Sequence, residues 1–300
     1  MSKPTVGVVI LNYNSHDLTL ALAKRTASLP SVDFVCVVDN ASGDHFDGEF
    51  SESNIHYIKS RENGGYSAGN NIGLRWLVEE RCCEYVFIAN PDVEFGDDAI
   101  SAVSEVLHSD PCVAVAATRR FGHDGARVMQ WYDLPSLQDA IGFCFAVSRR
   151  RAERRRLAAQ NDKVAGGGFV YVDAVPGAFF GMRSSFLVDN GYLDESTFLY
   201  GEERILGKQV ELAGLREALV CDATYVHDHA RGRFSSVDTF ERDHRSIVLY
   251  FERFRLAGPV GLALLRLCTA LGSAEYRIAC SIHGFLNRDP AAKEPCGGAA

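Results

Sequence analysis

The stretch VGVVILNYN, from Val6 to Asn14, consists of six mostly β-branched apolar residues followed by three polar ones. Such a run predicts a buried strand that ends at a polar edge. Similar runs recur at 34–39, 55–59, 85–90 and 113–117. The segments between them, at 18–29, 68–80 and 98–109, carry apolar residues near helical spacing. This alternation predicts an α/β fold with a mostly parallel central sheet and helices on both faces.

Polar residues follow four of the predicted strands. In an open α/β sheet, ligands bind in the crevice beyond the carboxyl ends of the strands. The polar segments are NYN at 12–14, DNASGD at 39–44, NGGYSAGNN at 63–71 and NPD at 90–92. The sequence therefore predicts one ligand-binding crevice at this edge of the sheet.

The composition limits the class of protein. The chain has 300 residues and a formal net charge of -8, which argues against nucleic acid as the main partner. Nine cysteines without a CxxC pair predict a reduced, cytoplasmic protein. The apolar run at 6–11 is too short for a signal peptide. The apolar segment at 256–271 contains Pro259 and Arg266 and falls short of the roughly 20 apolar residues that a membrane span needs.

Two of the polar segments have structural explanations as well as functional ones. Asp39 either binds a base or ribose, or caps the turn that follows it. Asn63, Gly64 and Gly65 form a turn before a helix whose N-terminus favours anionic groups. The loop matches neither GxGxxG nor a P-loop, so a plain tight turn is the alternative.

The segment Asn90-Pro91-Asp92 predicts a metal site. Mg²⁺ and Mn²⁺ take one or two protein carboxylates together with substrate phosphates, and proline leaves Asp92 at the end of the strand. The alternative role for Asp92 is a helix cap. His227 and His229 share one face of a predicted strand, so they either approach one ion or are structural.

Glu202 and Glu203 lie in YGEERILGKQV, at 200–210, where a helix is predicted to begin. Acids are common at this position because they complement the helix dipole. The functional alternative is that one of them is a base held over a substrate.

The succession of these motifs resembles the family 2 glycosyltransferases with the GT-A fold, particularly the bacterial rhamnosyltransferase-like branch. The resemblance runs from residue 5 to about residue 235 and is carried by VVILNYN, VVDNASGD, NGGYSAGNNIG, IANPDV, VPGAFFGMRSSFL, GYLDESTFLYGEERIL and YVHDHARG. It implies an inverting, metal-dependent transfer of sugar from a nucleotide donor, dTDP-rhamnose or a UDP-hexose. The implied acceptor is a surface glycan or its lipid-diphosphate carrier.

The resemblance also implies roles for individual residues. Glu203 matches the base that deprotonates the acceptor, with Glu202 as the alternative, and Asp92 and His227 match ligands of Mn²⁺ or Mg²⁺. The residues implied to border the nucleotide sugar are Asn12, Tyr13, Asp39, Asn63, Gly65, Asn70 and Asn90. Two positions depart from the family pattern: Asn90 replaces the first acid of the DxD motif, and the acidic pair is Glu-Glu where Glu-Asp is more usual.

Three parts of the chain are expected: a GT-A domain at 1–235, a helical extension at 236–288 and a disordered tail at 289–300. Six arginines between Arg149 and Arg156 either form a solvated helix or, with the C-terminal helices, contact an anionic lipid surface on the inner face of the membrane. A homodimer is an open alternative.

Two other functions stay open at this point. A nucleotidyltransferase would need a basic, glycine-rich loop directly after the first strand, which NYNSHD does not offer. The second alternative function is a non-catalytic nucleotide- or glycan-binding subunit with the same fold.

Overall fold

The computed structural model describes residues 3–43, 46, 48–122, 125, 128–227 and 237–286. The chain divides into two compact units. The first comprises residues 1–135 and 151–230, and the second comprises 136–150 and 231–300. Helix α5 (Ala146–Val164) carries the arginine run, as the sequence predicted, and its residues belong to both units.

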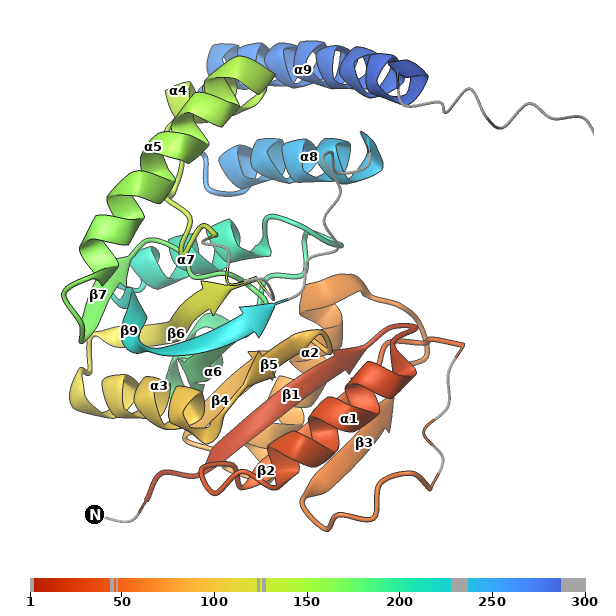
Figure 1. Ribbon diagram of the computed structural model, residues 1–300, viewed down its shortest axis with the longest axis vertical. Helices are drawn as coiled ribbons and strands as arrows, with labels where there is room; N and C mark the ends of the chain where they lie inside the picture. Colours follow the sequence, from red (N-terminus) through yellow and green to blue (C-terminus); the bar gives the residue numbers. More distant parts are fainter. Residues whose placement is uncertain are drawn as a thin grey trace, which may run out of the picture. The chain divides into compact units, whose positions relative to one another are not determined.

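The described part of the first unit is built on one nine-stranded sheet with the order β3-β2-β1-β4-β8-β6-β9-β5, and with β7 beside β9 (Figure 1). The strands are β1 (Val6–Asn12), β2 (Phe34–Asp39), β3 (Ile55–Lys59), β4 (Tyr85–Ala89), β5 (Val93–Phe95), β6 (Val113–Phe121), β7 (Phe169–Val172), β8 (Phe179–Arg183) and β9 (Arg216–His227).

The sheet is mixed, whereas the sequence predicted a mostly parallel one. Strands β3, β2, β1 and β4 are parallel neighbours, as expected, and β6 is parallel to β9. Strand β8 runs antiparallel to β4 and β6, and β5 and β7 run antiparallel to β9. A strand buried on both faces has the same apolar composition in either direction, so its direction is not encoded in its own residues.

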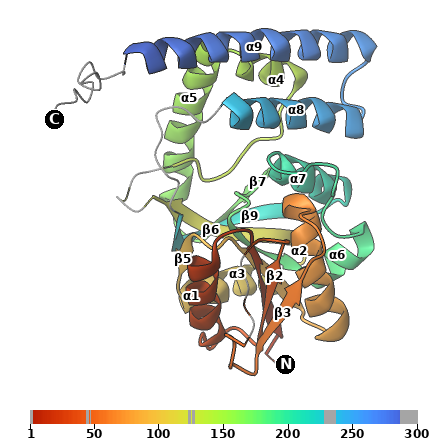
Figure 2. The same ribbon diagram turned by 90° about the vertical axis from the view of Figure 1, so that its right-hand side faces the viewer.

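Helices cover both faces of the sheet (Figure 2). Helices α1 and α3 bury residues such as Leu22 and Ile100 in one core, and α2, α6 and α7 bury residues such as Leu74 and Leu206 in the other. The bounds are α1 (His16–Ala27), α2 (Gly65–Arg75) with its π-helical continuation η1 (Trp76–Glu80), α3 (Asp97–Ser109), α6 (Ser184–Asn190) and α7 (Glu202–Leu212).

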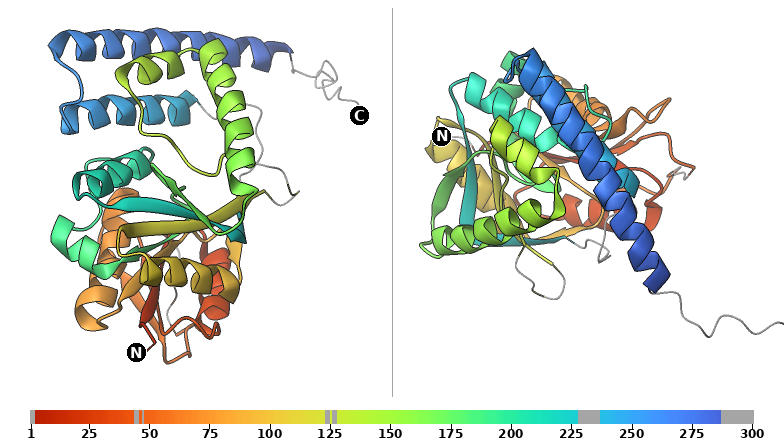
Figure 3. Two further views of the ribbon diagram at one scale, coloured as in Figure 1. Left: turned by 90° about the vertical axis from the view of Figure 1, so that its left-hand side faces the viewer. Right: turned by 90° about the horizontal axis from the view of Figure 1, so that it is seen from above.

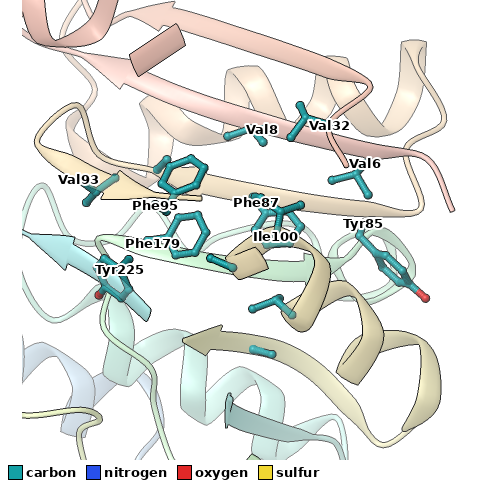
Figure 4. Packing of buried hydrophobic residues seen from close by; sticks show 14 of the residues in the cluster. Val6, Val8, Val32, Tyr85, Phe87, Val93, Phe95, Ile100, Phe179 and Tyr225 are labelled. Carbon is teal, nitrogen blue, oxygen red and sulfur yellow. The ribbon is translucent and has the colours of Figure 1, made fainter. Parts of the chain in front are cut away.

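Aromatic side chains fill the core around β5, β8 and β9 (Figure 4). Phe179 of β8 stacks on Phe95 of β5 with 4.3 Å between ring centroids, and its ring lies 5.3 Å from that of Tyr225 on β9. Phe95 and Tyr225 are also partners in the β5–β9 ladder. This packing fixes the short strand β5, and with it the residues just before it, against β9.

The second unit contains α4 (Leu137–Phe143), the start of α5, α8 (Val237–Arg253) and α9 (Pro259–Leu286). Helices α8 and α9 lie side by side (Figure 3), with Phe240 stacked on Tyr276 at 4.2 Å between ring centroids. In the described part of the chain, no helix combines the length and the apolar character that a bilayer crossing requires. The expected tail at 289–300 lies outside the described residues, and the boundaries at 235 and 288 remain predictions.

Candidate active site

Asp92 and His227 lie together although 135 residues separate them in the sequence. Strand β5 pairs with β9 so that Val93 lies opposite His227. The neighbouring carboxylate of Asp92 therefore meets the imidazole, with Oδ2 3.2 Å from Nε2. The His227 side chain is 5% exposed and that of Asp92 is 39% exposed. The imidazole is thus fixed in the protein while the carboxylate stays accessible to a ligand.

The chemistry of this pair fits a divalent metal. Imidazole suits transition metals and carboxylate suits Mn²⁺ and Mg²⁺, so the mixed pair favours Mn²⁺. Among the described residues, no group of three or more His, Cys, Asp and Glu side chains could hold a metal ion. His229, which the sequence placed on the same strand face as His227, lies outside those residues. With two protein ligands, the remaining coordination positions would fall to phosphate and water.

Glu202 and Glu203 begin α7, as the sequence predicted. Glu203 Oε1 accepts a hydrogen bond from the Gly177 N–H at 3.4 Å, and Gly177 belongs to the connection between β7 and β8. Both glutamates line a pocket together with Tyr66, Gly177 and Gln209. One wall of this small pocket therefore carries a carboxylate that is hydrogen-bonded to the backbone.

Close packing of α7 sets the position of Glu203. Gly201 caps the helix with a φ of 88°, in the left-handed region that favours glycine. A Cβ atom on Gly207 would lie 2.3 Å from the carbonyl oxygen of Asp173. Glu203 and Gly207 are four residues apart and share a face of the helix. The position of Glu203 therefore depends on how closely α7 packs against the segment that follows β7.

Asn12 and Asp39 are partners in the β1–β2 ladder, and both are fully buried. Asn12 Nδ2 donates to Asp39 Oδ1 at 3.3 Å and to Ser42 Oγ at 2.8 Å. Ser42 N–H donates to Asp39 Oδ1 at 3.1 Å, which is the turn-capping contact that the sequence left as an alternative. Tyr13, by contrast, is 51% exposed. The expected nucleotide edge is thus a buried polar network with one exposed aromatic ring beside it.

The glycine loop before α2 is shaped by its contact with the segment that precedes Glu202. Asn63 Oδ1 accepts from the Gly65 N–H at 3.0 Å. Gly65 has a φ of +87°, and a Cβ atom there would lie 2.3 Å from the carbonyl oxygen of Phe198. The Tyr66 N–H donates to that same carbonyl at 2.9 Å. Gly65 is therefore required by local packing, whatever else the loop binds.

Asn70 and Asn90 are hydrogen-bonded to different segments. Asn70 is fully buried; its Nδ2 donates to the Tyr66 carbonyl at 3.0 Å, and its Oδ1 has no hydrogen-bond partner among the described residues. The Asn90 N–H donates to the Ala178 carbonyl at 2.9 Å, which joins the predicted metal segment to the start of β8.

Tyr225 lies within electrostatic reach of both acidic parts of the site, and no motif in the sequence marked it. The residue is 1% exposed, it pairs in register with Arg120 of β6, and its hydroxyl has no hydrogen-bond partner among the described residues. Burial raises the pKa of the Tyr225 phenol, and the carboxylates of Glu203 and Asp92 add to the rise. Both acids therefore lie within electrostatic reach of one hydroxyl group.

Glu217 is a second residue that the sequence did not single out. It lies on β9, is 2% exposed, and its Oε2 accepts from the Val175 N–H at 2.6 Å. Burial raises the pKa of the Glu217 carboxyl well above its usual range, and the nearby acids Asp173 and Glu203 raise it further. Glu217 therefore retains its proton under conditions where an exposed glutamate has lost it.

Comparison with known proteins gives the family. Residues 7–173, more than half of the chain, match the profile described as glycosyl transferase family 2. The low-salt glycan biosynthesis hexosyltransferase Agl10 of Haloferax volcanii is 29% identical over 200 residues, which are 66% of this chain and 59% of that protein. The chain thus spans less than two thirds of the length of this relative.

Solved structures share the fold. The mannosyltransferase PcManGT from Pyrobaculum calidifontis, in complex with GDP-Man and Mn²⁺, matches with a TM-score of 0.56 and 16% identity over 97% of this chain and 78% of that one. GalNAc-T7 with UDP, GalNAc and Mn²⁺ matches with a TM-score of 0.57 and 11% identity over 94% of this chain and 58% of that one. These likenesses confirm the predicted GT-A fold. With the profile match and the ordered motifs, they lead to one conclusion: the chain belongs to glycosyl transferase family 2.

Proposed function

We propose that the protein transfers a sugar from a nucleotide-sugar donor to an acceptor hydroxyl, with inversion at the anomeric carbon. The observation that supports this most is that Glu203 and Asp92 both lie within electrostatic reach of Tyr225, while Asp92 contacts the His227 imidazole. Tyr225 lies two residues before His227 on the same strand, and both carboxylates influence its hydroxyl. A base and a metal-binding pair are the two parts that direct displacement of a diphosphate requires.

Glu203 acts on the acceptor side in this proposal. Its Oε1 is held by the Gly177 N–H, so the carboxylate is oriented before the acceptor arrives. Removal of the acceptor proton by such a base contributes about 10² to 10⁴ in rate. Glu202, which lines the same pocket, is the alternative base.

Asp92 and His227 act on the donor side and would hold Mn²⁺, or Mg²⁺ in its place. Both solved relatives contain Mn²⁺. A metal bound there stabilises the negative charge that develops on the leaving diphosphate. The buried imidazole supplies a fixed ligand, and the accessible Asp92 carboxylate supplies one that substrate can reach.

The donor is proposed to lie along the polar ends of the first four strands. The residues that we assign to it are Asn12, Tyr13, Asp39, Asn63, Gly65, Asn70 and Asn90. A dTDP-rhamnose or UDP-hexose donor follows from the sequence resemblance, whereas one solved relative holds GDP-Man. The acceptor in this proposal is a surface glycan or its lipid-diphosphate carrier.

A non-catalytic nucleotide-binding subunit is the second candidate. It is favoured by Asn90, which leaves the segment at 90–92 with one carboxylate in place of two. This candidate predicts nucleotide binding without turnover.

Thermal-shift measurements with UDP-glucose, dTDP-rhamnose and GDP-mannose, with Mn²⁺ and with EDTA, test the donor assignment. We expect one nucleotide to raise Tm only when Mn²⁺ is present. Asp92→Asn should abolish the Mn²⁺-dependent part of the shift, whereas Asp189→Asn, which changes an exposed acid on α6, should keep it. If no nucleotide shifts Tm, the donor assignment is wrong. A shift without release of nucleoside diphosphate would favour the non-catalytic subunit.

We further propose that the enzyme works on the cytoplasmic side of a membrane and contacts it peripherally. This proposal rests on the nine cysteines without a CxxC pair, a pattern typical of a reducing compartment. Helix α9 carries exposed large apolar residues at helical spacing, which form one face. They are Val260, Leu264, Leu267, Leu271, Ile278 and Ile282. The arginine run on α5 is a second candidate contact with anionic lipid, and a homodimer through the α9 face is the alternative.

A further inference from the structure

The turn formed by residues 175–178, between β7 and β8, contacts each acidic part of the proposed site. The Gly177 N–H donates to Glu203 Oε1 at 3.4 Å. The Gly177 carbonyl accepts from the Tyr66 hydroxyl. One residue further on, the Ala178 carbonyl accepts from the Asn90 N–H at 2.9 Å. The turn therefore lies between the proposed base and the segment that carries Asp92, and is hydrogen-bonded to both.

Glu217 holds the other end of the turn. Its Oε2 accepts from the Val175 N–H at 2.6 Å, and Val175 is 2% exposed. Pro176 has no N–H, so Val175 and Gly177 are the backbone donors on either side of it. Tyr66 and Glu217 thus hold the turn from α2 and from β9, through a partly buried and a buried hydrogen bond, respectively.

The Tyr66 hydroxyl and the Glu217 carboxyl, which hold the turn, are both uncharged. Burial raises the pKa of the Tyr66 phenol, and the neighbouring Glu202 and Glu203 raise it further, so the hydroxyl remains a donor. Glu217 keeps its proton for the same reason. Removing Glu217 would leave the buried Val175 N–H without its hydrogen bond, and removing the Tyr66 hydroxyl would leave the partly buried Gly177 carbonyl without one. An unmade hydrogen bond of this kind is costly, so the turn would move to find another partner.

The turn and the base are in direct contact, so a movement of one displaces the other. A Cβ atom on Gly177 would lie 3.2 Å from Glu203 Oε1 and 3.3 Å from its Cγ. No side chain fits at residue 177 unless Glu203 shifts. The same backbone contact that orients the carboxylate therefore also limits where it can lie.

We propose that Tyr66 and Glu217 are positioning residues which set, through the 175–178 turn, the separation between Glu203 and Asp92. This inference rests on the proposed function, because it takes Glu203 as the base. The two residues act on the reaction through the backbone of the turn and not through the substrate. A displacement of about 1 Å in a reacting group can lower the rate by about 10²-fold.

Three variants and one control test this role. Tyr66→Phe removes the donor to Gly177, Glu217→Met removes the acceptor for Val175, and Glu217→Gln restores a neutral acceptor at the same place. Tyr192→Phe is the control, since it removes a partly buried hydroxyl that donates to Glu79 at 2.8 Å and makes no hydrogen bond to the 175–178 turn. The measurement is kcat and donor KM by release of nucleoside diphosphate from UDP-glucose, dTDP-rhamnose and GDP-mannose with Mn²⁺.

We expect Tyr66→Phe and Glu217→Met to lower kcat about 10- to 100-fold, with donor KM changed by less than about twofold. Glu217→Gln should recover most of the wild-type kcat, and Tyr192→Phe should keep it. Wild-type kcat in both Tyr66→Phe and Glu217→Met, or an equal loss in Tyr192→Phe, would overturn the inference.

Crystal structures of the same variants decide the point without turnover. The inference predicts that the Glu203–Asp92 separation changes in Tyr66→Phe and Glu217→Met and not in Tyr192→Phe; an unchanged separation contradicts it. Glu203→Gln distinguishes a failure of the proposed base from a failure of the proposed positioning role. If that variant is fully active, the base assignment fails; if it is inactive while both positioning variants are normal, only the present inference fails.

Discussion

Asp92 and Glu217 have different surroundings, and these surroundings suit the two acids to different chemical roles. Asp92 is partly exposed beside the His227 imidazole, an arrangement that suits an ionised metal ligand. Glu217 is enclosed by β9 and the 175–178 turn, so burial raises the pKa of its carboxyl. Some sites combine proton transfer with charge stabilisation. In such sites it is typical that the surroundings keep one carboxyl group protonated and leave another ionised.

The raised pKa of Glu217 predicts a pH-dependent stability. Above the usual pKa of an exposed glutamate, about 4.3, the unfolded chain releases this proton while the folded chain keeps it. Stability contributed by this group is therefore lost as pH rises from that value towards the raised pKa. Glu217→Gln removes the effect. We expect a higher Tm than wild type at pH 7 and no difference at pH 4, measured by calorimetry.

The groups around Glu217 do not reverse the predicted loss of stability with rising pH. Asp173 and Glu203 raise the pKa of Glu217 together with burial, and only the hydrogen bond from Val175 lowers it. If the Tm difference between Glu217→Gln and wild type stays constant between pH 4 and pH 7, the side chain is not protonated in the fold.

At the scale of helices and strands, the site is assembled by contacts that a local pattern does not contain. The sequence predicted the strand before Asp39, the helix that begins at Glu202 and the helix near Val237, because each has its own periodicity or start signal. It could not predict the Asp92–His227 contact, since this depends on the pairing of β5 with β9. Alternation placed His227 and His229 on one face of a strand, yet it did not show which neighbours Glu217 and Tyr225 would meet.

The packing of α7 gives a prediction at this scale. Gly207→Ala places a Cβ atom against the Asp173 carbonyl, 2.3 Å away, so α7 must shift and Glu203 with it. We expect a loss of about 1 to 3 kcal/mol in the free energy of unfolding, together with a lower kcat. Denaturant titration and the nucleotide-release assay measure the two effects.

Gly142→Ala is the matched control for that variant. Gly142 is also a helical glycine, in α4, but nothing lies within 4 Å of the position of a Cβ atom. There the substitution should stabilise the chain by about 0.5 to 1 kcal/mol, because alanine has less backbone freedom to lose. Equal effects of the two substitutions would mean that α7 is not closely packed on the chain after β7.

At the scale of the whole molecule, the two units differ in composition and in proposed role. The first unit contains every residue that we assign to the reaction, and the second unit contains the exposed apolar face of α9. The first unit has the fold of the family. The family match does not indicate what binds the apolar face of α9.

Vesicle co-sedimentation tests the membrane proposal for the second unit. We expect wild type to sediment with phosphatidylglycerol vesicles at low ionic strength and to bind phosphatidylcholine vesicles weakly. The double variant Leu267→Glu/Leu271→Glu should bind at least about tenfold more weakly, because it puts two charges into the apolar face. Leu212→Glu, at an exposed leucine of α7, is the control. If wild type stays in solution and the double variant abolishes a dimer in light scattering, the α9 face is an interface between copies of the chain.

Paired measurement of catalysis and nucleotide binding in Glu203→Gln tests the central claim most directly. The amide keeps the size of the side chain and its contact with Gly177, but it cannot accept the acceptor proton. The account predicts that nucleoside diphosphate release falls by about 10² to 10⁴, while nucleotide affinity in Mn²⁺ changes by less than about twofold. Glu211→Gln, an exposed change on the same helix, should leave both values at the wild-type level. A Glu203→Gln enzyme that turns over its donor at the wild-type rate would contradict the account.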